Sequence, residues 1–385
     1  MSDPQSASAW PIRMSEASRK AIVEDVLARG DIQVNGSRPW DLQVHDERFY
    51  KRVLRDDALG LGESYMEEWW DVEELDEFFF RLLQIDLGDI RMSWQRKWTV
   101  LKDRFLNRQS KERALLNGQH HYDRGNDLFT VMLDATMNYT CGYWAEADTL
   151  EAAQIAKMDL VCRKIGLEPG DRVLDIGCGW GSMMKYAAEN YDVSCVGVTV
   201  SEEQKALGEE RCEGLPIEFR LTDYRDVSGT FDHIVSIGMF EHVGPKNYRT
   251  FFDTVDACLA DDGLFLLDTI GNRFSDNSTD SFTEKYIFPN GVIPSVKQIG
   301  EATERLLVME DWHNFGPDYD RTLMAWHENF EEGWDELRSR YGETFYRMWR
   351  YYLLSSAASF RMRKMQQWQI VFSSDGIMGG YSSVR

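Results

Sequence analysis

The sequence of 385 residues lacks the usual features of secreted, membrane-spanning and nucleic-acid-binding proteins. Its six cysteines form no C-x-x-C pair and its first ten residues contain no apolar signal segment, so we expect a reducing cytoplasm. No run approaches the roughly 20 apolar residues that a spanning helix needs, so any membrane contact should be peripheral. The net charge of −22 argues against nucleic acid as a partner.

Ligands for a metal ion and internal repeats are also missing from the sequence. The pair His120-His121 and the single His313 have no second ligand group at metal-binding spacing. We therefore expect no metal site. The chain contains no repeated unit and no low-complexity tract, so we expect ordinary globular folding.

One basic segment stands out in this acidic chain. Residues 91–113 contain eight Lys or Arg against two acids. A single helical stripe within the segment contains Trp94, Trp98, Leu101 and Phe105. A helix with aromatic and cationic faces suits the surface of an anionic bilayer. The same pattern equally fits a linker helix that packs on the next domain, so both interpretations stay open.

The pattern of secondary structure changes along the chain. Residues 15 to about 90 predict short helices with one strand-like interruption over 31–44, where Asn35-Gly36 indicates a hairpin. From residue 150 strands and helices alternate, which predicts a doubly wound parallel sheet with ligands beyond the carboxyl ends of its strands. We therefore divide the chain into a mainly helical unit, 1–115, and an α/β unit, 116–385.

A glycine loop follows the first predicted strand of the α/β unit, in DRVLDIGCGWG (171–181). A phosphate-binding P-loop would need Lys and then Ser or Thr after its last glycine, where this chain has Ser182-Met183. A dinucleotide loop would need G-x-G-x-x-G and an acidic residue after the second strand, where this chain has Thr199 and Ser201. The loop therefore predicts a ligand other than a nucleotide phosphate.

Asp175 precedes the first glycine by two residues and indicates which ligand the loop holds. A carboxylate there can pair with a cationic amino group and would repel a pyrophosphate. S-adenosylmethionine (SAM) carries an amino group and a sulfonium and has no phosphate. Together with Asp223 and the strand order, Asp175 predicts SAM as the cofactor.

Seven long ordered motifs lie between residues 120 and 372: HYDRGNDLF (121–129), NYTCGYW (138–144), LDIGCGWG (174–181), GVTVSEEQ (197–204), SIGMFEHVGPKNY (236–248), KYIFPNG (285–291) and MEDWHNFGPDYDRTLMAW (309–326). Together they resemble the cyclopropane-fatty-acyl-phospholipid synthase family, the mycolic acid cyclopropane synthase-like methyltransferases. The resemblance implies a seven-stranded, Rossmann-like methyltransferase domain behind a smaller helical domain. In bacterial members the smaller domain is associated with lipid binding and dimer formation.

The activity that this resemblance implies is methyl transfer from SAM to a cis double bond of a phospholipid acyl chain. The alkene attacks the sulfonium methyl and leaves a carbocation, and loss of a methyl proton closes the three-membered ring. The resemblance also implies a set of cofactor contacts, which joins Asp175 from the argument above. They are Tyr122, Tyr139, Thr140, Gly177, Gly179, Thr199 and Gln204, with Asp223 and Tyr224 around the adenine.

The base implied by the resemblance is a bound bicarbonate held by a cysteine, a glutamate, a histidine, an isoleucine backbone and a tyrosine. The matching positions are Cys141, Glu241, Ile270 and Tyr319, with Asp268 in place of the histidine. Asp268 could donate a proton to bicarbonate or replace bicarbonate as the base. It could also leave the proton in place, giving a methyl-branched or hydroxylated chain. The intact remainder of the site favours cyclopropanation with an altered base.

Three rival functions remain open at this point. The chain could be a lipid methyltransferase that leaves a methyl or methylene branch, or a SAM enzyme with a small soluble substrate. It could also be a membrane-associated binding protein without activity. The resemblance favours a homodimer in the cytoplasm, attached peripherally to the inner face of the cell membrane through Trp94, Trp98, Phe105 and the nearby basic residues.

Overall fold

The computed structural model describes residues 14–85 and 125–385. The predicted amphipathic segment 91–113, the predicted cofactor contact Tyr122 and the division at residue 115 lie outside the described residues. No helix within the described ranges is long and apolar enough to cross a membrane.

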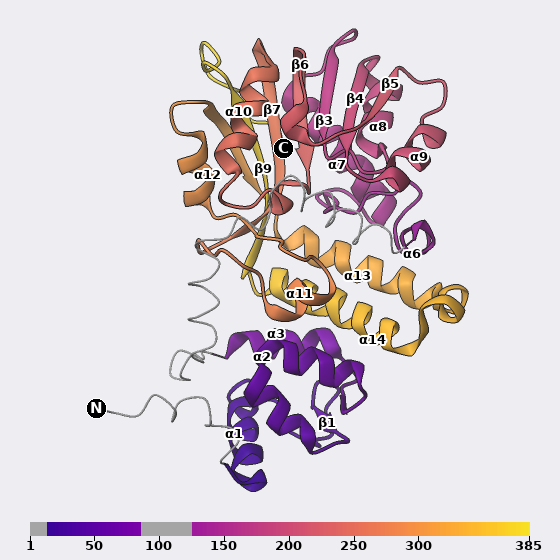
Figure 1. The fold of residues 1–385 in the computed structure, drawn as a ribbon, viewed down its shortest axis with the longest axis vertical. Helices are drawn as coiled ribbons and strands as arrows, with labels where there is room; N and C mark the ends of the chain where they lie inside the picture. The colour runs from indigo at the N-terminus through magenta and orange to yellow at the C-terminus, as the bar shows by residue number, and fades with distance from the viewer. Residues whose placement is uncertain (1–13, 86–124) are drawn as a thin grey trace.

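A seven-stranded sheet organises the larger part of the molecule (Figure 1). The first five strands of this sheet in chain order are parallel, as predicted, and the last strand in the chain lies between two others and is antiparallel to both. Apolar side chains on both faces of the parallel strands are buried, which is typical of a sheet covered by helices on both sides. In spatial order the strands are β5 (Ile217–Leu221), β4 (Ser194–Thr199), β3 (Arg172–Ile176), β6 (Phe231–Ile237), β7 (Leu259–Asn272), β9 (Met365–Ser373) and β8 (Val308–Asn314).

Helices cover both faces of this sheet, which confirms the doubly wound prediction. One core cluster joins α7 (Leu150–Ile165) and α8 (Ser182–Tyr191) to one face, and another joins α10 (Tyr248–Cys258) and α12 (Val296–Thr303) to the other. Neighbouring strand residues such as Leu266 and Leu267 fall in different clusters because a strand alternates its side chains. The remaining elements of this part are α9 (Glu202–Arg211), η2 (Tyr224–Asp226) and η3 (Phe240–His242).

The N-terminal unit is mainly helical and packs on the long C-terminal helices (Figure 1). The predicted hairpin at Asn35-Gly36 is not formed: Val34 makes an isolated parallel bridge with Leu42, and the short strand that ends this region pairs with a strand after α2. Residues of this unit share one hydrophobic core with α13 and α14. The N-terminal unit consists of α1 (Glu16–Arg29), β1 (Gln43–Val44), α2 (Arg48–Met66), β2 (Trp70–Asp71) and α3 (Leu75–Gln84). The other helices outside the sheet layers are α6 (Asn126–Met132), α11 (Ser281–Tyr286), α13 (Pro317–Glu332) and α14 (Trp334–Arg361).

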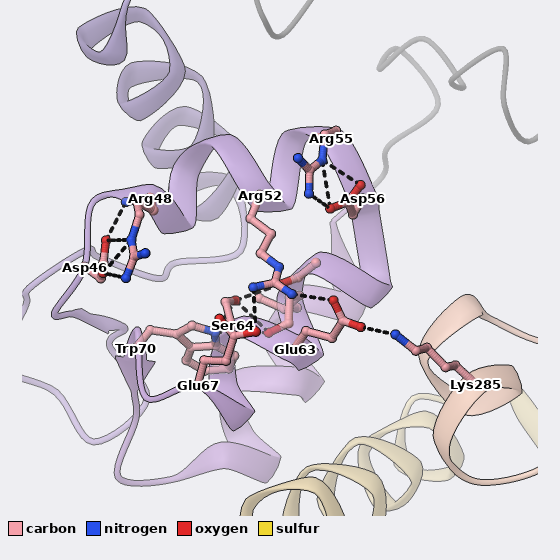
Figure 2. A network of polar contacts seen from close by, with 12 residues as sticks. Asp46, Arg48, Arg52, Arg55, Asp56, Glu63, Ser64, Glu67, Trp70 and Lys285 are labelled. Carbon is pink, nitrogen blue, oxygen red and sulfur yellow. Dashed lines mark hydrogen bonds and ion pairs between the residues drawn. The ribbon is translucent and has the colours of Figure 1, made fainter. Parts of the chain in front are cut away.

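Glu63 on α2 ties the N-terminal unit to α11 (Figure 2). Its carboxylate accepts hydrogen bonds from Lys285 at 2.6 Å, Tyr286 at 2.9 Å and Arg52 at 2.5 Å. Burial raises the pKa of Glu63, but these three donors outweigh burial and hold the pKa at about 2. The neighbouring Gly62 allows close packing, since an added Cβ would lie 2.2 Å from the Phe282 ring.

Glu63→Gln is expected to lower the free energy of unfolding by about 1–3 kcal/mol at neutral pH, because it removes the charge from three hydrogen bonds. A pKa lowered from 4.5 to about 2 in the folded state stabilises the protein above pH 4.5. That contribution is lost as the pH falls toward 2, so the two proteins should converge there. Urea unfolding across this range measures the difference. Glu67→Gln is the control, because Glu67 is 46% exposed and should change stability little.

Candidate active site

The glycine loop follows β3 at the carboxyl edge of the sheet and lines the main pocket. Gly177 and Gly179 adopt positive φ angles of 88° and 53°, which favour glycine. An added Cβ at Gly177 would lie 2.6 Å from Met239, whereas one at Gly179 would meet no described atom within 4 Å. The loop therefore leaves open space beside exposed backbone, as close approach of a ligand requires.

One pocket brings together the predicted cofactor contacts that the structure describes. Asp175 is buried and its Oδ1 has no hydrogen-bond partner within the described chain. Burial raises the pKa of Asp175 to about 7, although Lys157 acts in the opposite direction. The pocket is lined by Tyr139, Thr140, Asp175, Gly177, Gly179, Thr199, Gln204, Asp223 and Tyr224, among others.

The part of the pocket lined by Asp223 and Tyr224 suits a flat, weakly polar group. Tyr224 is buried, and its hydroxyl lacks a partner in the part of the protein described. Asp223 accepts hydrogen bonds from the backbone and the guanidinium of Arg225. Thr199 donates to the side-chain oxygen of Gln204 at 2.9 Å, which fixes both side chains at the end of β4. These contacts hold the pocket wall in place around Tyr224.

Glu241 lies in η3, between the pocket-lining residues Met239 and His242. Its Oε1 accepts a hydrogen bond of 2.7 Å from the backbone N–H of Ile270 on β7. Its Oε2 is buried and has no partner among the residues described. Burial raises the pKa of Glu241 to about 7, against the effects of the Ile270 N–H and the Thr269 hydroxyl. A carboxyl group with this pKa can exchange a proton near neutral pH.

Cys141 and Tyr319 complete the buried group that the sequence assigns to the reaction. The thiol of Cys141 is 1% exposed and donates to the Gly142 carbonyl. Burial and the nearby Asp268 raise the pKa of Cys141 well above its usual value, so the group is a thiol and not a nucleophilic thiolate. Tyr319 lies against Phe360, with ring centroids 4.5 Å apart, and its pKa is also raised by burial.

Asp268 is held by two glutamines from β9. It is 1% exposed, and it accepts hydrogen bonds from the amides of Gln367 at 2.5 Å and Gln369 at 2.9 Å. Burial raises the pKa of Asp268, whereas Lys157 and the two amides lower it. Asp268 is also near enough to Cys141 to raise the pKa of its thiol.

The model of the mycolic acid cyclopropane synthetase family matches residues 109–370. The cyclopropane-fatty-acyl-phospholipid synthase of Escherichia coli is 52% identical over 365 residues, covering 94% of this chain and 95% of that protein. The chain belongs to the cyclopropane synthetase family. This confirms the resemblance that the motifs between residues 120 and 372 indicated.

Two further relatives are useful for comparison. The mycolic acid cyclopropane synthase CmaA1, solved with SAH and CTAB, is 31% identical, with a TM-score of 0.64 over 67% of this chain and 97% of that one. The tuberculostearic acid methyltransferase UfaA1 of Mycobacterium tuberculosis is 32% identical, covering 83% of this chain and 80% of that protein.

The pocket residues fit SAM, the cofactor of this cyclopropane synthetase. The unpartnered oxygen of the buried Asp175, within the described chain, can accept the amino group of SAM. The open backbone at Gly179 admits a ligand without a clash, and the face of Tyr224 can lie beside the adenine. Tyr122 remains a predicted contact, because it lies outside the described residues.

Sequence reasoning missed three buried polar residues that surround the predicted site. Lys157 on α7 is 0% exposed and donates to Asn138 at 3.1 Å and Thr140 at 2.8 Å. Gln367 and Gln369 contact Asp268, as described above. For the two glutamines a sequence signal was available. Gln367 and Gln369 lie two positions apart in the apolar strand MQQWQIVF, which indicates one polar face.

Proposed function

We propose that the chain transfers the methyl group of SAM to the cis double bond of a phospholipid acyl chain and closes a cyclopropane ring. The observation that carries this proposal is the loop 138–141, which belongs to both halves of the site. Tyr139 and Thr140 line the cofactor pocket, and Cys141 next to them lies in the buried cluster with Asp268. The methyl group and the reacting carbons would therefore meet at this loop.

The residues of the site have distinct tasks in this reaction. When bound, SAM supplies an electrophilic methyl group on a sulfonium. Asp175 pairs with the amino group, and the glycine loop allows close approach. The electron-rich face of Tyr319, beside Phe360, stabilises positive charge on the acyl chain. We assign the reacting site to Cys141, Glu241, Asp268, Ile270 and Tyr319.

The test incubates the purified protein with methyl-labelled SAM and vesicles of a cis-monounsaturated phospholipid, and identifies the acyl product by NMR. We expect labelled cyclopropane ring protons and loss of the double bond. Label in a methyl or methylene branch would instead support the second function discussed below. Bound SAM with no label in lipid would contradict both functions.

A second function, methylation without ring closure, is favoured by Asp268 alone. The aspartate stands where the resemblance implies a histidine, and a changed group beside the carbocation can change how the proton is lost. The relative UfaA1 bears the name tuberculostearic acid methyltransferase, which refers to methylation and not to cyclopropane formation. Bicarbonate as the bound base stays a proposal for this chain.

The membrane is the proposed source of the substrate. Residues 1–115 would form the lipid-associating unit of a cytoplasmic homodimer at the inner face of the membrane. Trp94, Trp98, Phe105 and the basic residues around them would contact anionic lipid. Sedimentation with anionic and with neutral vesicles tests this surface, because a protein with a soluble substrate should bind neither.

A further inference from the structure

Three consecutive residues that follow β5 line one part of the cofactor pocket: Asp223, Tyr224 and Arg225. The side chain of Asp223 is 3% exposed and that of Arg225 is 18% exposed, so both charges are largely shielded from water. Charges in such an environment interact more strongly than charges on the surface. The ion pair between Asp223 and Arg225 is therefore a part of the pocket wall that can affect how the cofactor binds.

Arg225 holds the carboxylate of Asp223 in one orientation. The backbone N–H of Arg225 donates to Oδ1 at 3.0 Å. Nη1 of its guanidinium donates to Oδ1 at 3.2 Å and to Oδ2 at 3.0 Å. An ionised carboxylate offers about four acceptor positions and has no proton to donate. Oδ2 makes only this one contact with the residues described, so it can accept a further hydrogen bond from a ligand.

The same guanidinium also supports the aromatic residue of this segment. The central carbon of the Arg225 guanidinium lies 4.7 Å from the centroid of the Tyr224 ring. Phe251 meets the same ring edge-on, with 5.4 Å between the two centroids. Both contacts are of favourable types, a cation over an aromatic face and an edge-to-face aromatic pair. Arg225 therefore contacts both residues that the resemblance assigns to the adenine of SAM.

We propose that Arg225 is a positioning residue that makes the pocket selective for the 6-amino group of adenine over a 6-oxo group. Adenine carries an N–H donor at C6, whereas the deaminated base, hypoxanthine, carries a carbonyl oxygen there. The amino group donates to Oδ2 of Asp223, and a carbonyl oxygen would meet it as a second acceptor. This inference goes beyond the proposed function, because it concerns the adenine and not the fate of the methyl group.

The selectivity arises mainly from an unfavourable contact with the wrong base. A 6-oxo ligand would remove water from the Asp223 carboxylate without replacing the hydrogen bond that water made, which is unfavourable for a buried acceptor. Sites built to bond a donor group reject analogues that lack it for this reason. The guanidinium could attract a carbonyl oxygen, but its Nη1 already donates to Asp223 and its face lies over Tyr224.

The test measures the Kd of three ligands by isothermal titration. They are S-adenosylhomocysteine, its 6-oxo analogue S-inosylhomocysteine, and the analogue with hydrogen at C6. All three share the ribose and the amino acid, so their contacts elsewhere in the pocket are the same. For wild type we expect the 6-oxo analogue to bind roughly 100-fold more weakly than S-adenosylhomocysteine, with the third ligand between them. Equal or tighter binding of the 6-oxo analogue would overturn the inference.

Arg225→Leu removes the guanidinium and keeps the backbone N–H and an apolar side chain beside Tyr224. The Asp223 carboxylate can then rotate, so we expect the Kd of S-adenosylhomocysteine to rise roughly 10-fold. The 6-oxo analogue has no hydrogen bond to lose, so its Kd should change little and the selectivity should fall to roughly 10-fold. Arg225→Lys should restore part of the selectivity, because it returns a cation without the planar guanidinium.

Two further variants separate selectivity from general damage to the pocket. Asp223→Asn introduces an amide that donates as well as accepts, so it should bind the 6-amino and 6-oxo ligands with similar Kd. Adding Arg225→Leu to Asp223→Asn should not change that ratio further. Arg220→Leu is the matched control: Arg220 pairs with Glu218, which is 58% exposed, and neither residue lines the pocket. It should leave all three Kd values unchanged.

The outcomes of this test are distinct. An equal rise in Kd for all three ligands in Arg225→Leu would overturn the inference, because Arg225 would then support the pocket without selecting the base. If Arg225→Leu fails to fold, the wild-type series and Asp223→Asn still decide, and retained selectivity in Asp223→Asn would overturn the inference. The titrations contain no lipid, so their failure leaves the proposed function to the NMR assay described above.

Discussion

Asp175→Asn is expected to weaken SAM binding roughly 10- to 150-fold, the range that corresponds to losing a charge-assisted hydrogen bond of about 1.5–3 kcal/mol. Asp175 is buried at the carboxyl end of β3, and its Oδ1 has no partner in the described chain. The amino group of SAM would supply that partner. Isothermal titration with SAM measures the change in Kd.

The same substitution should make the cofactor-free protein more stable at neutral pH. The pKa of Asp175 is raised from 3.8 to about 7 in the folded protein, so folding carries no ionisation penalty below pH 3.8. The penalty grows as the pH rises from 3.8 to 7, and the neutral asparagine avoids it. Thermal unfolding without cofactor should therefore give a higher Tm for Asp175→Asn, which separates a binding defect from a folding defect.

SAM binding should also depend on pH through Asp175. The pKa of Asp175 is about 7, so at lower pH its carboxyl group is protonated and cannot pair with a cation. The Kd for SAM should therefore rise as the pH falls. Asp175→Asn should lose this dependence. Asp171→Asn is the matched control, because Asp171 precedes β3 at its opposite end and should leave Kd unchanged. Equal pH dependence in wild type and Asp175→Asn would contradict the assignment of Asp175.

Local sequence signals placed Asp175 and the glycine loop at the carboxyl edge of the sheet. The order of strand, glycine loop and helix predicted where Asp175 and Gly177 lie, because parallel strands all place their carboxyl ends at one edge. The dipeptide Asn35-Gly36 was a weaker signal, and the hairpin that it predicted is not formed. There Val34 forms only an isolated parallel bridge with Leu42, and β1 pairs with β2.

The hydrogen bonds from Gln367 and Gln369 to Asp268 could not be predicted from local patterns. Gln367 and Gln369 lie 99 and 101 residues after Asp268, and they reach it only because β9 enters the sheet between β7 and β8. Strand order of this kind is a property of tertiary packing, which a single sequence does not encode at short range. A resemblance to a family identified Asp268 as a departure, and the structure then supplied its partners.

Lys157→Met is expected to impair both halves of the site and to destabilise the protein by on the order of 3 kcal/mol, as loss of one partner from buried charges does. The ammonium of Lys157 is fully buried and donates to Asn138 and Thr140, which line the cofactor pocket. Burial lowers the pKa of Lys157, whereas Asp268 and Asp175 oppose that effect. Without the lysine these carboxyl groups would lose their shared cation.

Lys164→Met provides a matched control for this prediction. Lys164 is also buried on α7, but its Nζ lies 3.0 Å from His313, away from the cofactor pocket. Burial lowers the pKa of Lys164 to about 7, so its charge is already partly lost at neutral pH and methionine costs less. We expect Lys157→Met to raise the Kd for SAM and lower kcat, and Lys164→Met to preserve the Kd.

Adding Asp268→Asn to Lys157→Met should restore part of the stability, because it removes one uncompensated carboxyl group. A strictly additive loss in that double variant would show that Lys157 does not compensate Asp268.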